Sequence, residues 1–167
     1  MDPMLPIFIL IPLAGGSFSG LLSMSAHPEG FKAWYEKLKK APWNPPSWVF
    51  GPVWTILYLI MGYASYRVLD TEVALRWTAL GFFWAQLVLN MLWSPIFFGM
   101  RKPKLALYVM VVLWCLIVTT LVLFSFVDGV AAGLLGPYLC WVSYALSLNV
   151  YIVNNNDLES LEHQSRE

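Results

Sequence analysis

Residues 43 to 58 read Trp-Asn-Pro-Pro-Ser-Trp-Val-Phe-Gly-Pro-Val-Trp-Thr-Ile-Leu-Tyr, and they lead directly into an apolar segment long enough to cross a bilayer. Tryptophan rings supply large flat surfaces that suit a flat, apolar ligand. Tryptophan also anchors membrane helices at the level of the lipid headgroups, so each ring has a second interpretation. The stretch therefore predicts a membrane-spanning helix that begins either at a ligand pocket or at an interfacial anchor.

The composition places the chain among membrane proteins. It is 59% hydrophobic and only 12% charged, with a mean hydropathy of +0.63, whereas a soluble domain is typically about 25% charged. Its 167 residues leave no room for a membrane domain beside a soluble domain of ordinary size, roughly 100 to 200 residues each. We expect one transmembrane domain over residues 1–156 and a mobile acidic tail over residues 157–167. The formal net charge of zero gives no argument for a nucleic-acid partner.

Apolar stretches of membrane-spanning length recur along the chain. A bilayer core about 30 Å thick needs roughly 20 mostly apolar residues per helix. The stretches carry no Asp, Glu, Lys or Arg at their centres and lack the alternation of barrel strands, so helices are favoured. We predict an all-α membrane protein, a bundle of five transmembrane helices. The expected spans are 5–25, 47–68, 74–98, 105–126 and 130–153.

Basic residues are distributed unequally between the connections of these spans. The first loop, the third loop and the tail hold eight of the ten Lys and Arg, and the other side holds only Arg67 and Arg76. Positive residues favour the cytoplasmic side of a membrane. We therefore expect the first loop and the C-terminus to lie in the cytosol.

The first loop is long enough to have structure of its own. Between residues 28 and 42, Phe31, Trp34, Tyr35 and Leu38 recur at spacings of three and four, with charged residues between them. This pattern predicts a short amphipathic helix, too short to be stable alone. Its apolar face either lies on the membrane surface or folds over the mouth of the bundle as a lid.

The third predicted span carries amides at helical spacing. Gln86, Asn90, Trp93 and Phe97 are four, three and four residues apart, so they share one face. Unpaired amides are costly in lipid, and this face should point into the bundle. Two roles remain open for the amides: hydrogen bonds between helices, or orientation of the polar edges of a ligand that stacks on Trp93.

Landmarks from residue 34 to residue 149 closely resemble, in order and spacing, the translocator proteins, also called peripheral benzodiazepine receptors or tryptophan-rich sensory proteins. The landmarks are Trp34-Tyr35, Leu38, Pro42-Trp43, Pro45-Pro46, Trp48-Val49-Phe50, Pro52-Val53-Trp54, Leu57-Tyr58, Met61-Gly62-Tyr63, Gln86, Leu89-Asn90, Trp93, Pro95-Ile96-Phe97-Phe98-Gly99, Pro137-Tyr138-Leu139, Trp141 and Leu148-Asn149. The resemblance implies a five-helix bundle whose interior binds porphyrins, sterols and synthetic benzodiazepine-type ligands, with the first loop closing over the pocket.

The resemblance also implies site residues. Trp54 and Trp141 match positions at which members of the family hold or react with porphyrin. The expected ligand-binding residues are Trp54, Tyr58, Gln86, Asn90, Trp93, Tyr138, Trp141, Ala145, Leu148 and Asn149. The expected residues of the lid are Trp34, Leu38, Trp43, Pro45 and Pro46.

The expected function is that of a membrane receptor or carrier with a porphyrin or haem as ligand. Sterols rank below tetrapyrroles because no basic residue follows Tyr151 until Arg166, although Leu59, Tyr63 and Arg67 fit the loose sterol pattern. Cholesterol transport is one alternative. The other is light-dependent oxidative degradation of bound porphyrin, in which Trp54 and Trp141 are redox-active neighbours.

The chain offers no firm catalytic residue, and we expect neither a metal site nor a required cofactor. His27 and His163 are the only histidines, and His27 as an axial iron ligand is the less favoured interpretation. Cys115 and Cys140 are expected to be small buried hydrophobic residues. An enzymatic role is therefore less favoured than binding.

The remaining expectations concern assembly and location. Small residues at 16–20 and 81–85 allow close helix approach, either within the bundle or in a homodimer. The resemblance implies a homodimer and lipid bilayer contacts. It also implies the mitochondrial outer membrane, with partners such as the voltage-dependent anion channel, or a bacterial membrane if the chain is prokaryotic. We favour the mitochondrial location because residues 61–66 look more like the eukaryotic members of the family.

Overall fold

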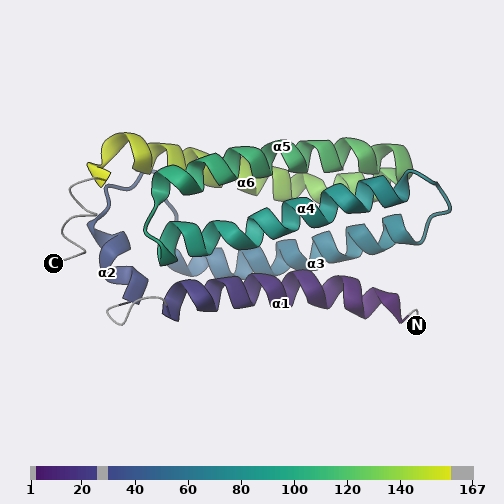
Figure 1. Cartoon of the computed structure of the whole chain (residues 1–167), viewed down its shortest axis with the longest axis horizontal. Helices are drawn as coiled ribbons and strands as arrows, with labels where there is room; N and C mark the ends of the chain where they lie inside the picture. Colours follow the sequence, from purple (N-terminus) through teal and green to yellow (C-terminus); the bar gives the residue numbers. More distant parts are fainter. Residues whose placement is uncertain (1–2, 26–29, 159–167) are drawn as a thin grey trace.

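The computed structural model describes residues 3–25 and 30–158, with only the backbone described for residues 24 and 30–33. Five long helices run side by side along the molecule (Figure 1), and all five are long and apolar enough to cross a membrane. The predicted five-helix fold is therefore confirmed. The long helices are α1 (Met4–Ser25), α3 (Phe50–Leu69), α4 (Arg76–Ser94), α5 (Pro103–Val127) and α6 (Gly129–Asn155).

Three shorter elements lie in or beside the connections. The amphipathic helix predicted in the first loop is present as α2 (Gly30–Lys37). A 3₁₀ turn, η1 (Ser47–Val49), leads into α3. The end of α4 widens into a π-helical turn, η2 (Pro95–Gly99), closed by a bond from Met100 N–H to Pro95 O at 2.8 Å. This turn was not expected from the sequence.

The two ends of the bundle differ in what they carry (Figure 1). We call the end that holds α2, η2 and the last turns of α6 the loop end. The other, the turn end, holds the N-terminus and the links between α3 and α4 and between α5 and α6. The proposed acidic tail lies outside the described residues from residue 159 onward, as do His27 and His163.

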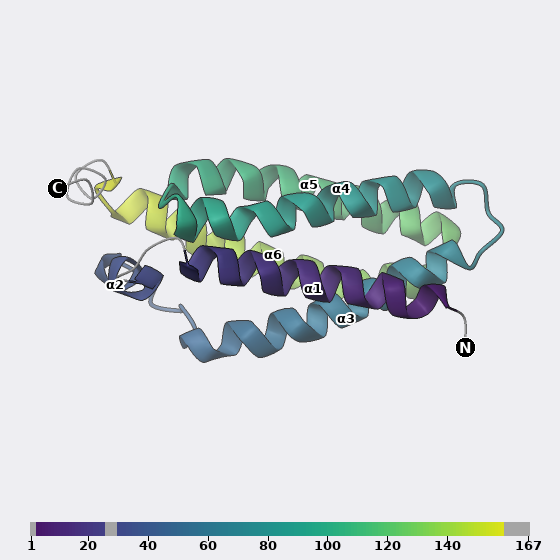
Figure 2. The same cartoon turned by 60° about the horizontal axis from the view of Figure 1, so that its bottom comes forward.

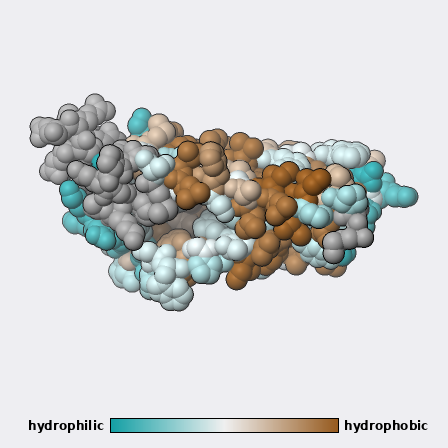
Figure 3. Space-filling model, turned by 90° about the horizontal axis from the view of Figure 1, so that it is seen from below, coloured by the Kyte–Doolittle hydropathy of each residue, from teal (hydrophilic) through white to brown (hydrophobic). Residues whose placement is uncertain are grey.

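A hydrophobic band crosses the middle of one face of the molecule. Figure 3 shows apolar residues across the centre of one face and hydrophilic residues towards both ends. Cys115 and Cys140 belong to the exposed surface of the helices, so the expectation that they are buried is wrong. Lipid tails are as apolar as a protein interior, and an apolar residue on a membrane helix has no preference for the core over the lipid-facing side.

Close packing between α1 and α3 depends on glycine. A Cβ atom added to Gly62 would lie 2.6 Å from the carbonyl oxygen of Phe8 and 2.7 Å from the Cα of Ile9. Both contacts are with backbone atoms, which cannot rotate away. Further along α1, a Cβ on Gly16 would lie 2.1 Å from the ring of Tyr58. In the first small-residue patch, Gly16 therefore serves packing within the bundle.

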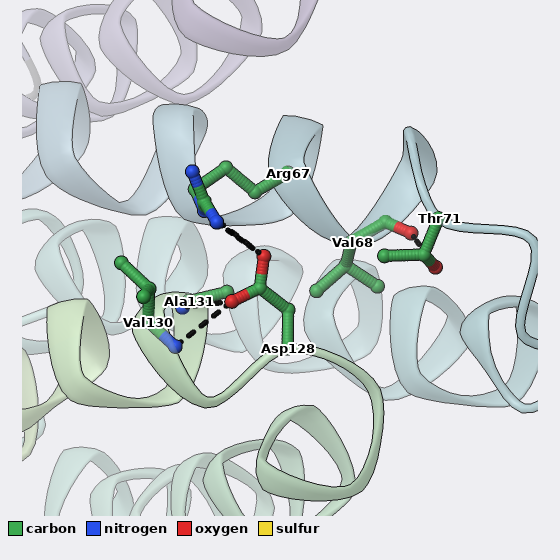
Figure 4. A network of polar contacts seen from close by, with 6 residues as sticks. All are labelled: Arg67, Val68, Thr71, Asp128, Val130 and Ala131. Atoms are coloured by element: carbon green, nitrogen blue, oxygen red, sulfur yellow. Dashed lines mark hydrogen bonds and ion pairs between the residues drawn. The ribbon is translucent and has the colours of Figure 1, made fainter.

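An ion pair ties α3 to the start of α6 at the turn end (Figure 4). Arg67 Nε donates to Asp128 Oδ2 at 2.9 Å. The other carboxylate oxygen of Asp128 accepts the N–H groups of Val130 at 2.8 Å and Ala131 at 3.1 Å, which makes it the N-cap of α6. Although partial burial raises the pKa of Asp128, the two N–H groups and Arg67 outweigh it, and the net shift is downward.

Candidate functional site

A chain of hydrogen bonds crosses the middle of the bundle. Tyr58 of α3 donates to Asn90 Oδ1 of α4 at 2.7 Å, and Asn90 Nδ2 donates to the Tyr138 hydroxyl of α6 at 3.2 Å. Tyr138 in turn donates to Gln86 Oε1 at 2.6 Å. All of these side chains are buried. The two amides therefore do what the first interpretation expected: they bond helices to one another.

Trp54 stacks on the loop-end side of this network. Its ring lies 5.4 Å from that of Tyr58 with an interplanar angle of 27°, and it meets Tyr138 edge to face at 6.2 Å. Residues 54 and 58 are one helical turn apart, which places both rings on the same face of α3. Trp54 is only half-buried, so part of its surface stays free for a further contact.

A second aromatic group surrounds Trp141 on α6. Phe50 of α3 meets it edge to face at 5.7 Å, and Tyr144 lies at 5.6 Å. The indole nitrogen of Trp141 is buried and has no hydrogen-bond partner among the described residues, and the same holds for Nε2 of Gln86. Buried donors without partners cost free energy, commonly about 1–3 kcal/mol each.

Trp93 belongs to a separate group near the loop end. Its ring stacks on Phe97 at 5.0 Å, and its indole N–H donates to Asn149 Oδ1 at 3.3 Å. Asn149 also donates to the carbonyl of Pro103 at 3.2 Å. Asn149 and Trp93 thus fasten α6 and α4 to the start of α5, and the described contacts of both side chains are structural.

The start of α3 diverges from α1 towards the loop end (Figure 2). Figure 3 shows that the face formed by these helices is hollowed in this part of the molecule. The close contacts of α1 with α3 involve Gly62 and Tyr58, which come after the first two turns of α3. Trp54 and Phe50 belong to the diverging half of α3. We call this hollow the recess.

The apolar face of α2 packs on the loop end of the bundle. Trp34 and Leu38 are buried, and Trp34 meets Phe97 edge to face at 5.8 Å. They share a cluster with Ile152 of α6 and with Leu158. The buried side chains of α2 therefore face the bundle. The side chain of Phe31 lies outside the described part of the chain.

Residues 39–46, which we call the strap, connect α2 to α3 across the end of α6. Tyr144 donates to the carbonyl of Trp43 at 2.6 Å, and the Trp43 indole donates to Ser147 at 3.4 Å. Within the loop, Tyr35 donates to Asn44 Oδ1 at 3.2 Å. Burial raises the pKa of Tyr35, which keeps it protonated for this bond. Pro45 is half-buried and Pro46 is exposed at the start of α3.

A shallow groove of about 500 Å³ lies where the strap meets α6. Trp43 is one of its lining residues, at an exposed fraction of 52%. It is distinct from the recess between α1 and α3. Its lining consists of Trp43, Ser143, Leu146, Ser147, Val150, Tyr151, Asn154 and Asn155.

The structure places most of the predicted ligand residues in the three groups described above. Trp54, Tyr58, Gln86, Asn90 and Tyr138 form the first, Trp141 belongs to the second, and Trp93 and Asn149 form the third. Ala145 is half-buried and Leu148 buried on α6. Phe50 and Tyr144 were missed as partners of Trp141, although Phe50 lies one turn before Trp54 and Tyr144 three residues after Trp141, spacings that place each pair on one face.

The side chains named in these groups are uncharged, combining aromatic rings, amides and phenols. In the described ranges there is no group of three or more His, Cys, Asp or Glu residues that could hold a metal ion. Aromatic faces and neutral hydrogen-bonding groups suit a flat, largely apolar molecule with polar edges.

Comparisons with known proteins agree over most of the chain. The sequence model of the TspO/MBR family matches residues 8–154 of this chain. The tryptophan-rich protein TspO of Chlorobaculum tepidum is 41% identical over 150 residues, which are 89% of this chain and 90% of that protein. The human translocator protein is 41% identical over 154 residues, 89% of this chain and 88% of its own length. The tryptophan-rich sensory protein of Cereibacter sphaeroides is 44% identical over 116 residues, 70% and 72% of the two chains.

Proposed function

The chain belongs to the TspO/MBR family, and we propose that it is a receptor or carrier for planar hydrophobic ligands, with tetrapyrroles ahead of sterols and of synthetic benzodiazepine-type ligands. Family membership and the five apolar helices make it an integral, multi-pass membrane protein and support a ligand-binding role there. The proposed site is the recess near the loop end, walled by Trp54 and Trp141.

One observation carries the proposal: Trp54 is half-buried and presents a ring already stacked on Tyr58. A porphyrin that enters the recess would extend this stack. Tyr58 and Tyr138 are held by Asn90 and Gln86, so the aromatic wall is fixed before a ligand arrives. Preorganisation of this kind reduces the entropic cost of binding.

The unpartnered N–H groups support a ligand with acceptor atoms at its edge. Trp141 Nε1 and Gln86 Nε2 are buried donors without partners among the described residues. Propionate or carbonyl oxygens of a tetrapyrrole are suitable acceptors, because a hydrogen bond to a charged acceptor is stronger than one to a neutral group.

Titration with protoporphyrin IX tests the proposal. The purified protein in lipid nanodiscs is titrated, and binding is followed by the shift of the porphyrin Soret band, which does not depend on the number of tryptophans. Trp54→Ala and Trp141→Ala should each weaken binding by about tenfold, since an aromatic pair contributes about 0.5–1.5 kcal/mol beyond its area burial. The matched control is Trp77→Ala, because Trp77 is 62% exposed at the start of α4. Equal affinity in all four proteins would refute the site.

Light-dependent degradation of the bound porphyrin is the second candidate. It is favoured by the contact of two oxidisable rings, Trp54 and Tyr58. An illuminated porphyrin in the presence of O₂ generates reactive oxygen species itself, so the protein needs to supply only confinement and oxidisable neighbours. Illumination of the complex in air should then bleach the Soret band faster than illumination of free porphyrin. An unchanged bleaching rate would remove this candidate.

Sterol binding and cholesterol transport rank lower because neither Tyr63 nor Tyr151 has a free basic side chain at the position that the sterol pattern requires. Arg67, the basic residue of the Leu59, Tyr63 and Arg67 pattern, is paired with Asp128. The groove beside Tyr151 is lined by uncharged side chains. Neither position offers the free basic group that the loose pattern requires.

A further inference from the structure

We propose that Asn156 and Leu158, two of the three residues that follow α6, form a latch that holds the first loop closed and sets the rate of ligand exchange. The loop-closing part stands on contacts alone, and the ligand-exchange part rests on the proposed function. These residues come after the region that matches the family, which ends at residue 154.

The polar half of the latch is the amide of Asn156. Its Oδ1 accepts the backbone N–H of Lys39 at 2.8 Å, and its Nδ2 donates to the backbone carbonyl of Lys39 at 3.0 Å. Both backbone groups of one strap residue are thus bound by one side chain that is 117 residues away in sequence. Nδ2 also donates to the carbonyl of Ile152 at 2.9 Å, which fixes the amide against α6.

The apolar half of the latch is Leu158. Its side chain is 6% exposed and lies in the cluster that contains Trp34 and Leu38 from the first loop. Ile152 and Phe97 belong to the same cluster. The chain after α6 therefore holds α2 by an apolar contact and the strap by a hydrogen-bonded one.

The position of the strap explains why its release would open the site. The strap is held at Lys39 by Asn156 and at Trp43 by Tyr144 and Ser147. Beyond these contacts it continues through Pro45 and Pro46 into α3, at the point where α3 diverges from α1 (Figure 2). Prolines restrict the chain, so movement of the strap is passed on to the start of α3. The hydrogen bonds of Asn156 go to the strap and to α6 rather than to the walls of the recess, and it acts as a positioning residue.

The three consecutive asparagines at the end of α6 provide a matched control. Asn156 binds the strap, whereas Asn155 Nδ2 donates only within the helix, to Tyr151 O at 2.9 Å. Asn156→Ala removes the latch bonds, and Asn155→Ala removes an amide of the same size next to it. Leu158→Ala weakens the apolar half independently.

The first experiment measures loop opening without any ligand. Amide hydrogen exchange of Lys39 and trypsin cleavage after Lys39 or Lys40 are followed in the protein in nanodiscs. Asn156→Ala should accelerate both by about tenfold, the effect of losing one or two net hydrogen bonds. Leu158→Ala should do the same in part, and Asn155→Ala should match the wild type. Wild-type rates in Asn156→Ala would overturn the latch.

The second experiment measures protoporphyrin IX association and dissociation by stopped-flow, with an excess of apomyoglobin as the acceptor for released porphyrin. A latch changes the barrier rather than the walls of the site, so both rates should rise by about tenfold in Asn156→Ala while Kd changes less than about threefold. Faster loop opening with unchanged ligand rates would overturn the control of exchange. If the wild type binds no porphyrin, the proposed function fails, while the ligand-free measurements still decide the loop-closing part.

Discussion

The turn end and the loop end of the bundle are built from the same helices but held together differently. At the turn end, α1 and α3 touch backbone to backbone at Gly62, and Arg67 and Asp128 tie α3 to α6. At the loop end, α3 diverges from α1, Trp34 and Leu38 of the first loop pack with Leu158, and Asn156 binds the backbone of Lys39.

We therefore expect the stability of the fold to depend mainly on the turn end, and the rate of ligand exchange on the loop end. Local opening follows the regions with few buried contacts and many exposed hydrogen bonds. The bonds between Asn156 and Lys39 are exposed, whereas the network of Tyr58, Asn90 and Tyr138 between the two ends is buried. Variants at the turn end should therefore change unfolding, and variants at the loop end should change ligand exchange.

The largest expected effect comes from Gly62→Ala. The added methyl group meets the backbone of Phe8 and Ile9, and overpacking of this kind costs typically about 1–3 kcal/mol. Thermal unfolding in nanodiscs should show a clearly lower Tm. Gly81→Ala is the control, since a Cβ atom added to Gly81 would meet no neighbouring helix within 4 Å and alanine favours the helix over glycine by about 1 kcal/mol. Equal Tm shifts in the two variants would show that the α1–α3 contact does not hold the turn end.

The next effect concerns the buried network between the two ends. Asn90→Leu leaves the hydroxyl of Tyr58 without its acceptor, and an unsatisfied buried group costs about 1–3 kcal/mol. Both Tm and porphyrin affinity should fall, because the network also fixes the wall of the recess. Asn154→Leu, at the exposed end of α6, should leave both unchanged. A loss of Tm without loss of affinity would separate the network from the site.

The smallest effect is expected at the N-cap of α6. Asp128→Ala removes a cap, which costs typically about 1 kcal/mol, whereas Asp128→Asn keeps a capping side chain and removes only the ion pair with Arg67, a partly exposed pair of small net value. Unfolding in nanodiscs should rank the wild type and Asp128→Asn close together, and Asp128→Ala below them. A Tm of Asp128→Asn as low as that of Asp128→Ala would show that the ion pair, rather than the cap, holds this end.

Asp128 should also make the Tm of the protein depend on pH. The pKa of Asp128 is lowered in the folded protein, so its stabilising contribution is present above the pKa of the unfolded carboxyl and is lost as the pH falls through the folded pKa. The Tm difference between the wild type and Asp128→Ala should thus be constant near neutral pH and shrink in acid. A difference that grew in acid would contradict the direction of the shift.

The helices could be predicted from the sequence because hydropathy and charge report the length of each span directly. The predicted start of the fourth span at residue 105 is two residues late, since Pro103 is the first residue of α5. The π-helical turn was missed because it depends on the bond from Met100 to Pro95, which no apolar spacing reveals. The faces of Cys115 and Cys140 were mistaken because apolar residues on a membrane helix suit lipid and core alike.

The amides of the site could be located from their spacing, but not their partners. A helical face predicts that Gln86 and Asn90 point inward, and it leaves open which side chains from α3 and α6 meet them. The role of Asn156 could not be predicted, since its bonds go to the backbone of Lys39, and nearly every residue carries the same backbone N–H and C=O groups. Which backbone groups an amide meets depends on how the fold places the two segments.

The position of the bound porphyrin can be measured in a structure of the protein with protoporphyrin IX in nanodiscs. We expect the macrocycle in the recess between α1 and α3, stacked against Trp54, with an edge oxygen near the indole nitrogen of Trp141. A porphyrin seated instead in the groove lined by Trp43, or on the lipid-facing surface of the helices, would refute the proposed site.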